Sequence, residues 1–150
     1  MNLLVIHGPN LHLLGKREPG IYGRITLKAL NALIKNHAAA RGVKTRCFQS
    51  NCEGAIIDLL TANAAWTDAL IINPAAYTHY SYAIRDAIKA LEMFAVEIHL
   101  SDISKREPFR KISVIKPVCV KQIKGFGADS YLKAIDFCLA AAGKNGKHSK

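Results

Sequence analysis

Short apolar segments alternate with longer helical patterns along this chain, and this alternation restricts the fold more than any other feature of the sequence. Residues 3–6, 45–48, 69–72, 95–98 and 117–120 are apolar runs of the kind that form buried strands. Residues 26–40, 53–65, 81–91 and 129–142 carry apolar side chains at helical spacing. The pattern predicts a parallel sheet with helices on both faces, joined by right-handed crossovers.

Five strands in so short a chain suit the doubly wound, flavodoxin-like α/β fold, in which the strand order is 2-1-3-4-5. The sequence has no internal repeat or low-complexity linker, so we expect a single domain over residues 1–150. Thr26 and Asp129 are expected to cap helices, and Gly42 and Gly143 to lie just beyond helix ends. Residues 143–150 are expected to form a flexible basic tail.

The composition narrows the partners that this chain can have. Half of the residues are hydrophobic, which is enough for one sizeable core, but no apolar stretch is long enough to cross a bilayer. The N-terminal segment lacks the basic start of an export signal, so we expect a cytoplasmic protein that binds no membrane. A formal net charge of +10 favours anionic partners. The basic residues are not interleaved with aromatic ones, so nucleic acid is not expected among them.

In the order 2-1-3-4-5, ligands bind beyond the carboxyl ends of strands 1, 3 and 4. Polar segments follow these predicted strands at residues 7–10 (HGPN), 73–79 (NPAAYTH) and 97–101 (EIHLS). We therefore expect three clusters of hydrogen-bonding side chains to converge on one crevice. Asn10 and Asn73 could hold a water or donate to a developing oxyanion, or could equally be residues of Asx turns.

Glu97 and His99 are two residues apart at the end of a predicted strand, so their side chains point to the same face of the sheet. The carboxylate can then orient the imidazole and stabilise its protonated form, which makes His99 a candidate general acid. A purely structural pair is equally compatible with this spacing. His79 and His7 fit hydrogen-bonded pocket or core residues better than catalysts.

A glycine-rich stretch at residues 15–23 (GKREPGIYG) follows the first polar segment and resembles a mobile lid, although a plain surface loop would have the same composition. Tyr22 in this stretch is a candidate general base. Tyrosine has an ordinary pKa of about 10, so it needs a cationic neighbour to favour the phenolate, and Arg17 is the candidate. Arg106 and Arg110 could bind an anion or a hydroxylated ring, or could form a solvated basic loop.

Sequence signals for cofactors are absent. No GxxxxGK[ST] occurs, residues 125–127 (GFG) lack the third glycine of a dinucleotide site, and the histidines and cysteines show no zinc-ligand spacing. The cysteines form no CxxC pair, so we expect buried free thiols at Cys47, Cys52, Cys119 and Cys138. A base, an acid, amides and arginines without a cofactor or metal point to proton-transfer chemistry, such as elimination or isomerisation of an anionic substrate.

The same residues resemble the type II 3-dehydroquinate dehydratase family over positions 2–142. The segments that carry the resemblance are 8–23 (GPNLHLLGKREPGIYG), 49–58 (QSNCEGAIID), 72–87 (INPAAYTHYSYAIRDA), 97–110 (EIHLSDISKREPFR) and 125–135 (GFGADSYLKAI). The resemblance implies a cofactor-free hydro-lyase that converts 3-dehydroquinate to 3-dehydroshikimate by anti elimination through an enolate. It also implies a flavodoxin-like subunit in a dodecamer of four trimers.

The resemblance further implies a role for each site residue. Tyr22 would take the C2 proton, and Arg17 would favour its phenolate. His99, oriented by Glu97, would protonate the departing C1 hydroxyl, and Asn10 would help to hold the enolate. The implied substrate-binding residues are Asn73, His79, Asp86, Leu100, Ser101 and Arg110. Of these, Asp86 is expected to come from a neighbouring subunit.

The chain departs from the usual family pattern at four positions, none of which is an expected proton-transfer residue. These positions are His7, His12, Cys52 and Ala75, where the family more often shows Asn, Asn, His and Gly. Two rival functions remain open at this level. One is a flavin-binding or anion-binding module on the same fold, and the other is a basic nucleic-acid or scaffold protein without activity.

Overall fold

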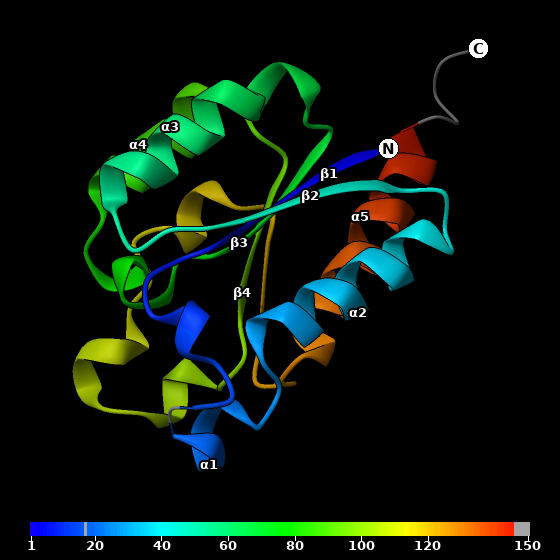
Figure 1. Cartoon of the computed structure of the whole chain (residues 1–150). Coiled ribbons are helices and arrows are strands. Elements are labelled where there is room, and N and C mark those ends of the chain that lie inside the picture. The colour runs from blue at the N-terminus through cyan, green and yellow to red at the C-terminus, as the bar shows by residue number, and fades with distance from the viewer. Residues whose placement is uncertain (17, 146–150) are drawn as a thin grey trace.

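The computed structural model describes residues 1–16 and 18–145, and the side chains of residues 22, 144 and 145 lie outside that description. The strands form one five-stranded sheet, whose order β2-β1-β3-β4-β5 confirms the prediction (Figure 1). Every neighbouring pair of strands is parallel. The strands are β1 (Asn2–His7), β2 (Lys44–Gln49), β3 (Ala69–Asn73), β4 (Ala95–His99) and β5 (Lys121–Lys124).

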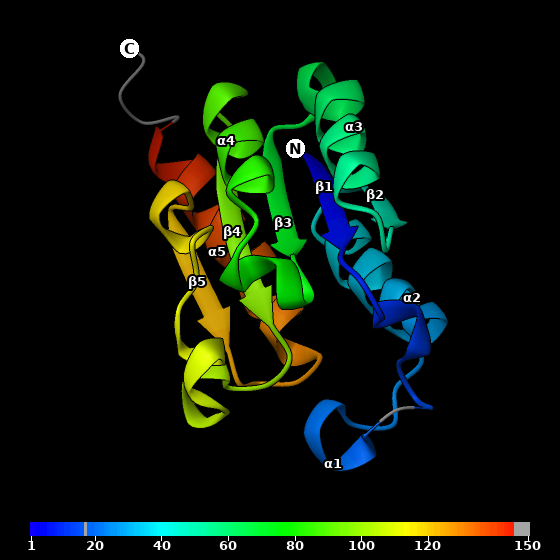
Figure 2. The same cartoon turned by 90° about the vertical axis from the view of Figure 1, so that its left-hand side faces the viewer.

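Helices cover both faces of the sheet (Figure 2). On one face lie α2 (Leu27–Ala39) and α5 (Asp129–Asn145), and on the other lie α3 (Glu53–Asn63) and α4 (Tyr82–Ala90). The short helix α1 (Pro19–Tyr22) projects beyond the carboxyl ends of the strands. The 3-10 turns are Leu11–Leu13, Ala64–Trp66, Ala75–His79, Ile103–Lys105, Pro108–Lys111 and Lys116–Val118.

The central strands are buried on both faces because side chains alternate along each strand. In β1, Leu3 and Val5 join the core beneath α2 and α5, whereas Leu4 and Ile6 join the core beneath α3 and α4. All four side chains are fully buried, and each contributes about 1.5–3 kcal/mol by leaving water. The two hydrophobic cores thus pack against opposite faces of the sheet and fix the positions of its strand ends.

The fifth strand lies later in the chain than predicted. Residues 117–120 were expected to form it, but Lys116–Val118 is a 3-10 turn, and pairing with β4 begins with Lys121 opposite Val96. Pro117 has no N–H to give to a ladder, which favours the turn. β5 is an edge strand in which only Ile123 is buried, so a mostly polar sequence is sufficient there.

The helix ends agree with the sequence in part. The Thr26 hydroxyl accepts a 3.2 Å hydrogen bond from the N–H three residues later, and Gly42 has a φ of 71°, so both predictions are confirmed. Asp129, however, is the first residue of α5 rather than its cap. The prediction for Gly143 is also wrong, because α5 continues to Asn145 and Gly143 lies inside it. Residues 146–150 of the predicted tail lie outside the described residues.

The cysteines are free thiols, as expected, but they are not all buried. Cys138 is buried, Cys47 and Cys119 are half-buried, and Cys52 is exposed just before the start of α3. Burial raises the pKa of Cys47 to about 11 and the pKa of Cys119 and of Cys138 to about 12. These three groups are therefore protonated thiols of low reactivity near neutral pH.

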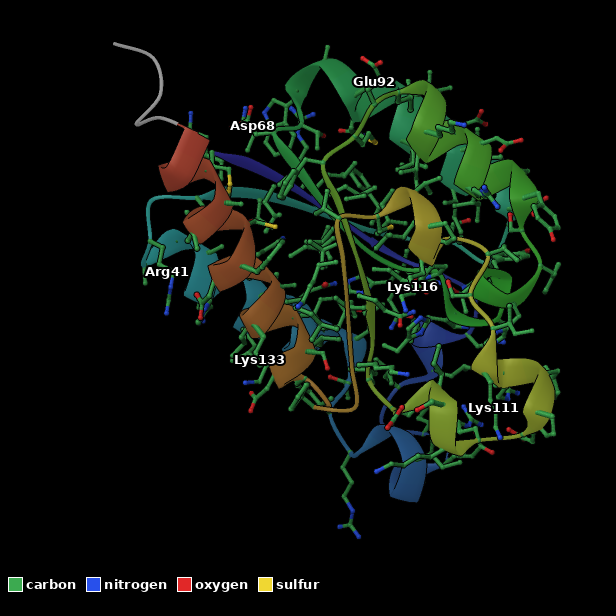
Figure 3. All side chains as sticks on the ribbon, turned by 180° about the vertical axis from the view of Figure 1, so that it is seen from behind. Arg41, Asp68, Glu92, Lys111, Lys116 and Lys133 are labelled. Carbon is green, nitrogen blue, oxygen red and sulfur yellow. The ribbon has the colours of Figure 1, made fainter. Side chains whose placement is uncertain are left out.

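Charged side chains occupy the outer surface of several elements. The exposed residues labelled in Figure 3 are Arg41, Asp68, Glu92, Lys111, Lys116 and Lys133. They lie on or beside helices and turns on both sides of the sheet. Over residues 1–16 and 18–145, no helix combines the length and the apolar character needed to span a membrane.

Candidate active site

A pocket of about 120 Å³ opens at the carboxyl ends of β1, β3 and β4, where ligands bind in folds of this order. All three polar segments identified in the sequence contribute to its wall. The predicted site residues that line it are Asn10, Asn73, His79, His99, Leu100, Ser101 and Arg110. Apolar side chains of Leu11, Leu14 and Ile103 complete the wall.

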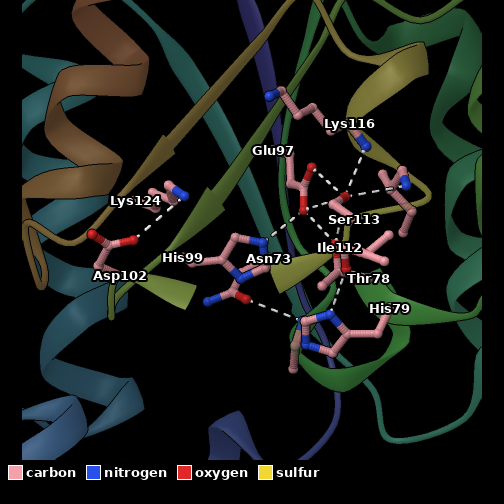
Figure 4. Close-up of polar contacts among 12 residues, drawn as sticks. Asn73, Thr78, His79, Glu97, His99, Asp102, Ile112, Ser113, Lys116 and Lys124 are labelled. Atoms are coloured by element: carbon pink, nitrogen blue, oxygen red, sulfur yellow. Dashed lines mark hydrogen bonds and ion pairs between the residues drawn. The ribbon is translucent and has the colours of Figure 1, made fainter. Parts of the chain in front are cut away.

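His99 lies in the pocket wall with Glu97 directly behind it. The two atoms that join them, His99 Nε2 and Glu97 Oε1, are 2.6 Å apart, and Glu97 is fully buried. The same carboxylate accepts hydrogen bonds from the hydroxyls of Thr78 and Ser113, the latter at 2.9 Å to each oxygen (Figure 4). The predicted contact between Glu97 and His99 is therefore present.

Glu97 remains ionised in spite of its burial. Burial raises its pKa, but the hydrogen bond and charge of His99 and the hydrogen bonds of Thr78 and Ser113 outweigh that effect, and the net pKa is lowered. An ionised carboxylate at this distance stabilises an imidazolium. Because Nε2 faces Glu97, Nδ1 of His99 is the nitrogen left to exchange a proton with a ligand.

The backbone fixes the hydrogen-bonding state of His79. Its Nδ1 lies 2.7 Å from the carbonyl oxygen of Ile112, which can only accept, so Nδ1 carries a proton (Figure 4). Burial lowers the pKa of His79, and nearby His99 and Arg110 lower it further against the effect of the Ile112 hydrogen bond. Neutral His79 then keeps a lone pair on Nε2, which can accept a hydrogen bond from a hydroxyl group.

The two asparagines are held at turns that follow β1 and β3. Asn10 has a left-handed φ of 68°, and its N–H donates to Asn51 Oδ1 at 3.0 Å. Asn73 Oδ1 accepts a 3.1 Å hydrogen bond from the N–H of Ala75, which makes an Asx turn. The amide oxygen of Asn73 thus has a structural partner, while the residue also lines the pocket.

Two arginines bring positive charge to the rim of the pocket. The Nε of Arg110 lies 2.9 Å from a carboxylate oxygen of Glu107, and its guanidinium lies 4.8 Å from the ring centroid of Phe109. Arg106 also lines the pocket, with its Nε 3.7 Å from the same carboxylate oxygen. The exposed Glu107 therefore holds both guanidiniums at the rim of the pocket, where they can bind an anionic ligand.

Metal-binding groups do not gather here. Within the part of the chain that the structure describes, no three His, Cys, Asp or Glu side chains lie together in a way that could hold a metal ion. The polar groups of the pocket are amides, imidazoles, a hydroxyl and guanidiniums. Such groups suit an oxygen-rich organic anion.

The structure does not describe two of the predicted site residues in full, and two described ones, Glu97 behind His99 and Asp86, do not line the pocket. Arg17 lies outside the described residues, and the side chain of Tyr22, the last residue of α1, does so too. Asp86 lies exposed on α4 and does not line the pocket.

Thr78 and Ser113 are the functional candidates that the sequence did not reveal. Thr78 belongs to the polar segment after β3, but nothing in its spacing marks it as a partner of Glu97. Ser113 lies in an irregular stretch before the 3-10 turn Lys116–Val118. Only the fold brings these hydroxyls to one buried carboxylate.

Comparisons with known proteins agree with this arrangement. The family model described as dehydroquinase class II matches residues 1–139. A 3-dehydroquinate dehydratase of Roseiflexus castenholzii is 51% identical over 144 residues, which are 96% of this chain and 92% of that protein. One from Geotalea daltonii is 54% identical over 132 residues, covering 88% of this chain and 92% of the relative.

Solved structures show the same similarity. The crystal structure of type II dehydroquinase from Butyrivibrio crossotus matches with a TM-score of 0.91 and 46% identity, covering 93% of this chain and 97% of that one. The type II dehydroquinase from Propionibacterium acnes matches with a TM-score of 0.89 and 35% identity, covering 93% and 96%. Sequence, fold and pocket together show that this chain belongs to the class II dehydroquinase family.

Proposed function

We propose that this protein removes water from 3-dehydroquinate to give 3-dehydroshikimate, by anti elimination through an enolate. The observation that carries the proposal is His99, held in the pocket wall by a buried, ionised Glu97. Hydroxide is a poor leaving group, so the reaction needs a proton donor. A histidine backed by a carboxylate is suited to that task.

The elimination takes place in two steps. A base takes a proton from C2, and the electron pair forms an enolate with the C3 carbonyl. The enolate then collapses, the C1–O bond breaks, and His99 gives its proton to the departing hydroxyl as water. By family resemblance the base is Tyr22, Arg17 favours its phenolate, and Asn10 helps to hold the enolate.

The rest of the pocket fits the polar groups of this substrate. Neutral His79 offers Nε2 as an acceptor for a ring hydroxyl, and Arg110 lies beside it at the rim. Asn73 and the backbone of Leu100 and Ser101 would bind the carboxylate, close to the carboxyl ends of β3 and β4. A net positive chain draws such an anion toward the pocket.

The proposal includes an assembly of subunits, a dodecamer of four trimers in which Asp86 of one chain contacts substrate bound to the next. Two observations support it. Asp86 is exposed on α4 and outside its own pocket, and Tyr82, one turn before it, is 61% exposed. A large exposed aromatic side chain on the same helix face as Asp86 is typical of an interface.

The direct test follows the conjugated enone product by ultraviolet absorbance after 3-dehydroquinate is added. We expect turnover by the unmodified protein and a loss of about a hundredfold or more in His99→Ala, because general acid catalysis contributes that much. Glu97→Gln should lose less. The matched control is His37→Ala, which removes a histidine that pairs with Asp136 away from the pocket. A purified protein that carries a flavin and shows no turnover would contradict the proposal.

The base is tested separately with Tyr22→Phe, which keeps the ring and removes the hydroxyl. Turnover should collapse, while binding of 3-dehydroquinate measured by calorimetry should weaken far less. Near-normal turnover in this variant would mean that another group takes the C2 proton. Mixed oligomers of Asp86→Ala and His99→Ala subunits test the shared site, because sites that draw one defect from each chain should fail.

A further inference from the structure

The backbone decides in which direction the hydroxyl group of Ser113 forms its hydrogen bonds. Two backbone N–H groups donate to Ser113 Oγ, that of Lys116 at 2.9 Å and that of Ile115 at 3.2 Å (Figure 4). A hydroxyl oxygen has two acceptor sites, so these two donors fill both. The one hydrogen of Ser113 is left to donate, and it meets the Glu97 carboxylate, whose two oxygens each lie 2.9 Å from Ser113 Oγ.

The hydroxyl group of Thr78 is committed to the same carboxylate. Its oxygen lies 2.9 Å from Ser113 Oγ, which has no acceptor site left for it. The hydrogen of Thr78 therefore goes to Glu97 Oε1, which also accepts from His99 Nε2. The backbone holds this arrangement in place, because the N–H of Val114 donates to the carbonyl oxygen of Thr78 at 2.8 Å. Thr78 and Glu97 are both fully buried, so protein donors and not bulk water satisfy the carboxylate.

Each hydroxyl that donates to Glu97 draws negative charge out of its carboxylate and makes it less basic. Burial raises the pKa of Glu97, but the hydrogen bonds of His99, Thr78 and Ser113 and the charge of His99 lower it overall. A less basic carboxylate attracts an imidazolium less strongly. The two hydroxyls therefore limit how tightly Glu97 holds a protonated His99.

This limit matters for a general acid, which must release its proton as well as hold it. A buried carboxylate 2.6 Å from His99 Nε2 without other donors would favour the imidazolium strongly and slow the loss of its proton. We propose that Ser113 and Thr78 are positioning residues that moderate the charge of Glu97, so that His99 releases its Nδ1 proton to the departing hydroxyl. The inference rests on the proposed function, in which His99 is the proton donor. Neither Ser113 nor Thr78 lines the pocket, so both act through Glu97.

A simpler role for Ser113 would be to cap the 3-10 turn Lys116–Val118. That role uses only the oxygen of Ser113, and it makes the opposite prediction for His99. Loss of a cap would loosen the contact between Glu97 and His99, and the imidazolium would become less stable. Loss of a donor that moderates the carboxylate would make the imidazolium more stable. The direction in which the titration of His99 moves therefore separates the two roles.

The test is Ser113→Ala, with the titration of the His99 ring followed by nitrogen-15 spectra in the absence of substrate. The midpoint of this titration should rise by about 0.5 pH unit or more, because the carboxylate becomes more basic. The other titratable groups affected by the charge of Glu97 include His79 and Cys119, and both are unchanged in the variant. A midpoint that falls or stays in place overturns the proposal.

Two further variants serve as controls for the titration. Ser113→Thr keeps the hydroxyl and should restore the midpoint of the unmodified protein. Ser104→Ala is the matched control, because it removes an exposed hydroxyl that donates to the Asp102 carboxylate at 2.6 Å. This variant should leave the midpoint of His99 unchanged.

Turnover gives an independent readout through a double-mutant cycle with Glu97→Gln. Ser113→Ala alone should lower kcat about threefold to thirtyfold with little change in KM. In the Glu97→Gln background, the same change should alter kcat less than about twofold, because the carboxylate on which Ser113 acts is gone. Effects on kcat that multiply would show a separate role for Ser113 and overturn the proposal.

The proposal stays testable if Ser113→Ala does not fold. Thr78→Val removes the second hydroxyl at nearly constant volume, and it should also raise the midpoint of His99. In the unmodified protein, neutral His99 should carry its hydrogen on Nε2, and a neutral ring with its hydrogen on Nδ1 would overturn the proposal whatever the variants do. An upward shift of the midpoint together with an absence of turnover would instead reject the proposed function alone.

Discussion

The buried His7 should make the stability of this protein fall between pH 7 and pH 5. Its folded pKa of about 4 lies below the ordinary value of 6.5, because burial disfavours the charged ring. As pH falls below 6.5 the unfolded chain takes up a proton that the folded protein refuses, so stability is lost in this window and the loss levels off near pH 4. The full effect is about 3 kcal/mol, and about 2 kcal/mol of it falls between pH 7 and pH 5.

The perturbation is His7→Asn, which removes the titrating ring and introduces the residue that the family more often shows at this position. The assay is urea unfolding followed by circular dichroism at pH 7, 6 and 5, at one protein concentration. The other histidines, including His79 with its lowered pKa, are common to both proteins and cancel in the comparison. Glu97 also cancels, because its lowered pKa affects stability only at more acid pH.

The free energy of unfolding of the unmodified protein should fall by about 2 kcal/mol more than that of His7→Asn over these two pH units. The variant loses hydrogen bonds to Asn31 and Tyr131 at every pH, so only the change of the difference with pH is diagnostic. A difference that stays constant from pH 7 to pH 5 would show that His7 is not buried in its neutral form.

Further predictions concern residues beside the pocket and one control in a helix. Gly8→Ala should cost several kcal/mol or prevent folding, because the new Cβ would lie 2.6 Å from the carbonyl oxygen of Pro74. The matched control is Gly54→Ala in α3, where the new Cβ meets nothing within 4 Å, and it should raise stability in thermal unfolding by about 0.5–1 kcal/mol. Ala75→Gly should raise stability by about 0.5 kcal/mol, because a φ of 51° strains an L-residue by more than the added glycine entropy costs, and the opposite sign in urea unfolding would contradict this. Ser113→Ala removes a hydroxyl 2.9 Å from both oxygens of the Glu97 carboxylate, and it should lower kcat by about threefold to thirtyfold with little change in KM.

Much of this protein can be predicted from local pattern alone. The alternation of apolar runs and helical spacing predicts a parallel sheet with helices on both faces, and five strands suit the order 2-1-3-4-5, which the structure confirms. From that order it follows that Asn10, Asn73 and His99 meet at one pocket, since each comes directly after or at the end of a central strand. The contact of Glu97 with His99 is equally local, because residues two apart on a strand share a face.

The tertiary structure decided what depends on contacts between distant segments. The edge strand β5 starts at Lys121 and not at the more apolar residue 117, because an edge strand needs few buried side chains and Pro117 cannot join a ladder. Ser113 reaches Glu97 from an irregular segment whose composition gives no sign of it. His7 meets Tyr131 across 124 residues of sequence, and its neutral state is set by burial between α2 and α5, which no local pattern encodes. Local spacing thus determines which strand ends carry the chemistry, whereas burial and long-range packing determine the protonation and orientation of the groups found there.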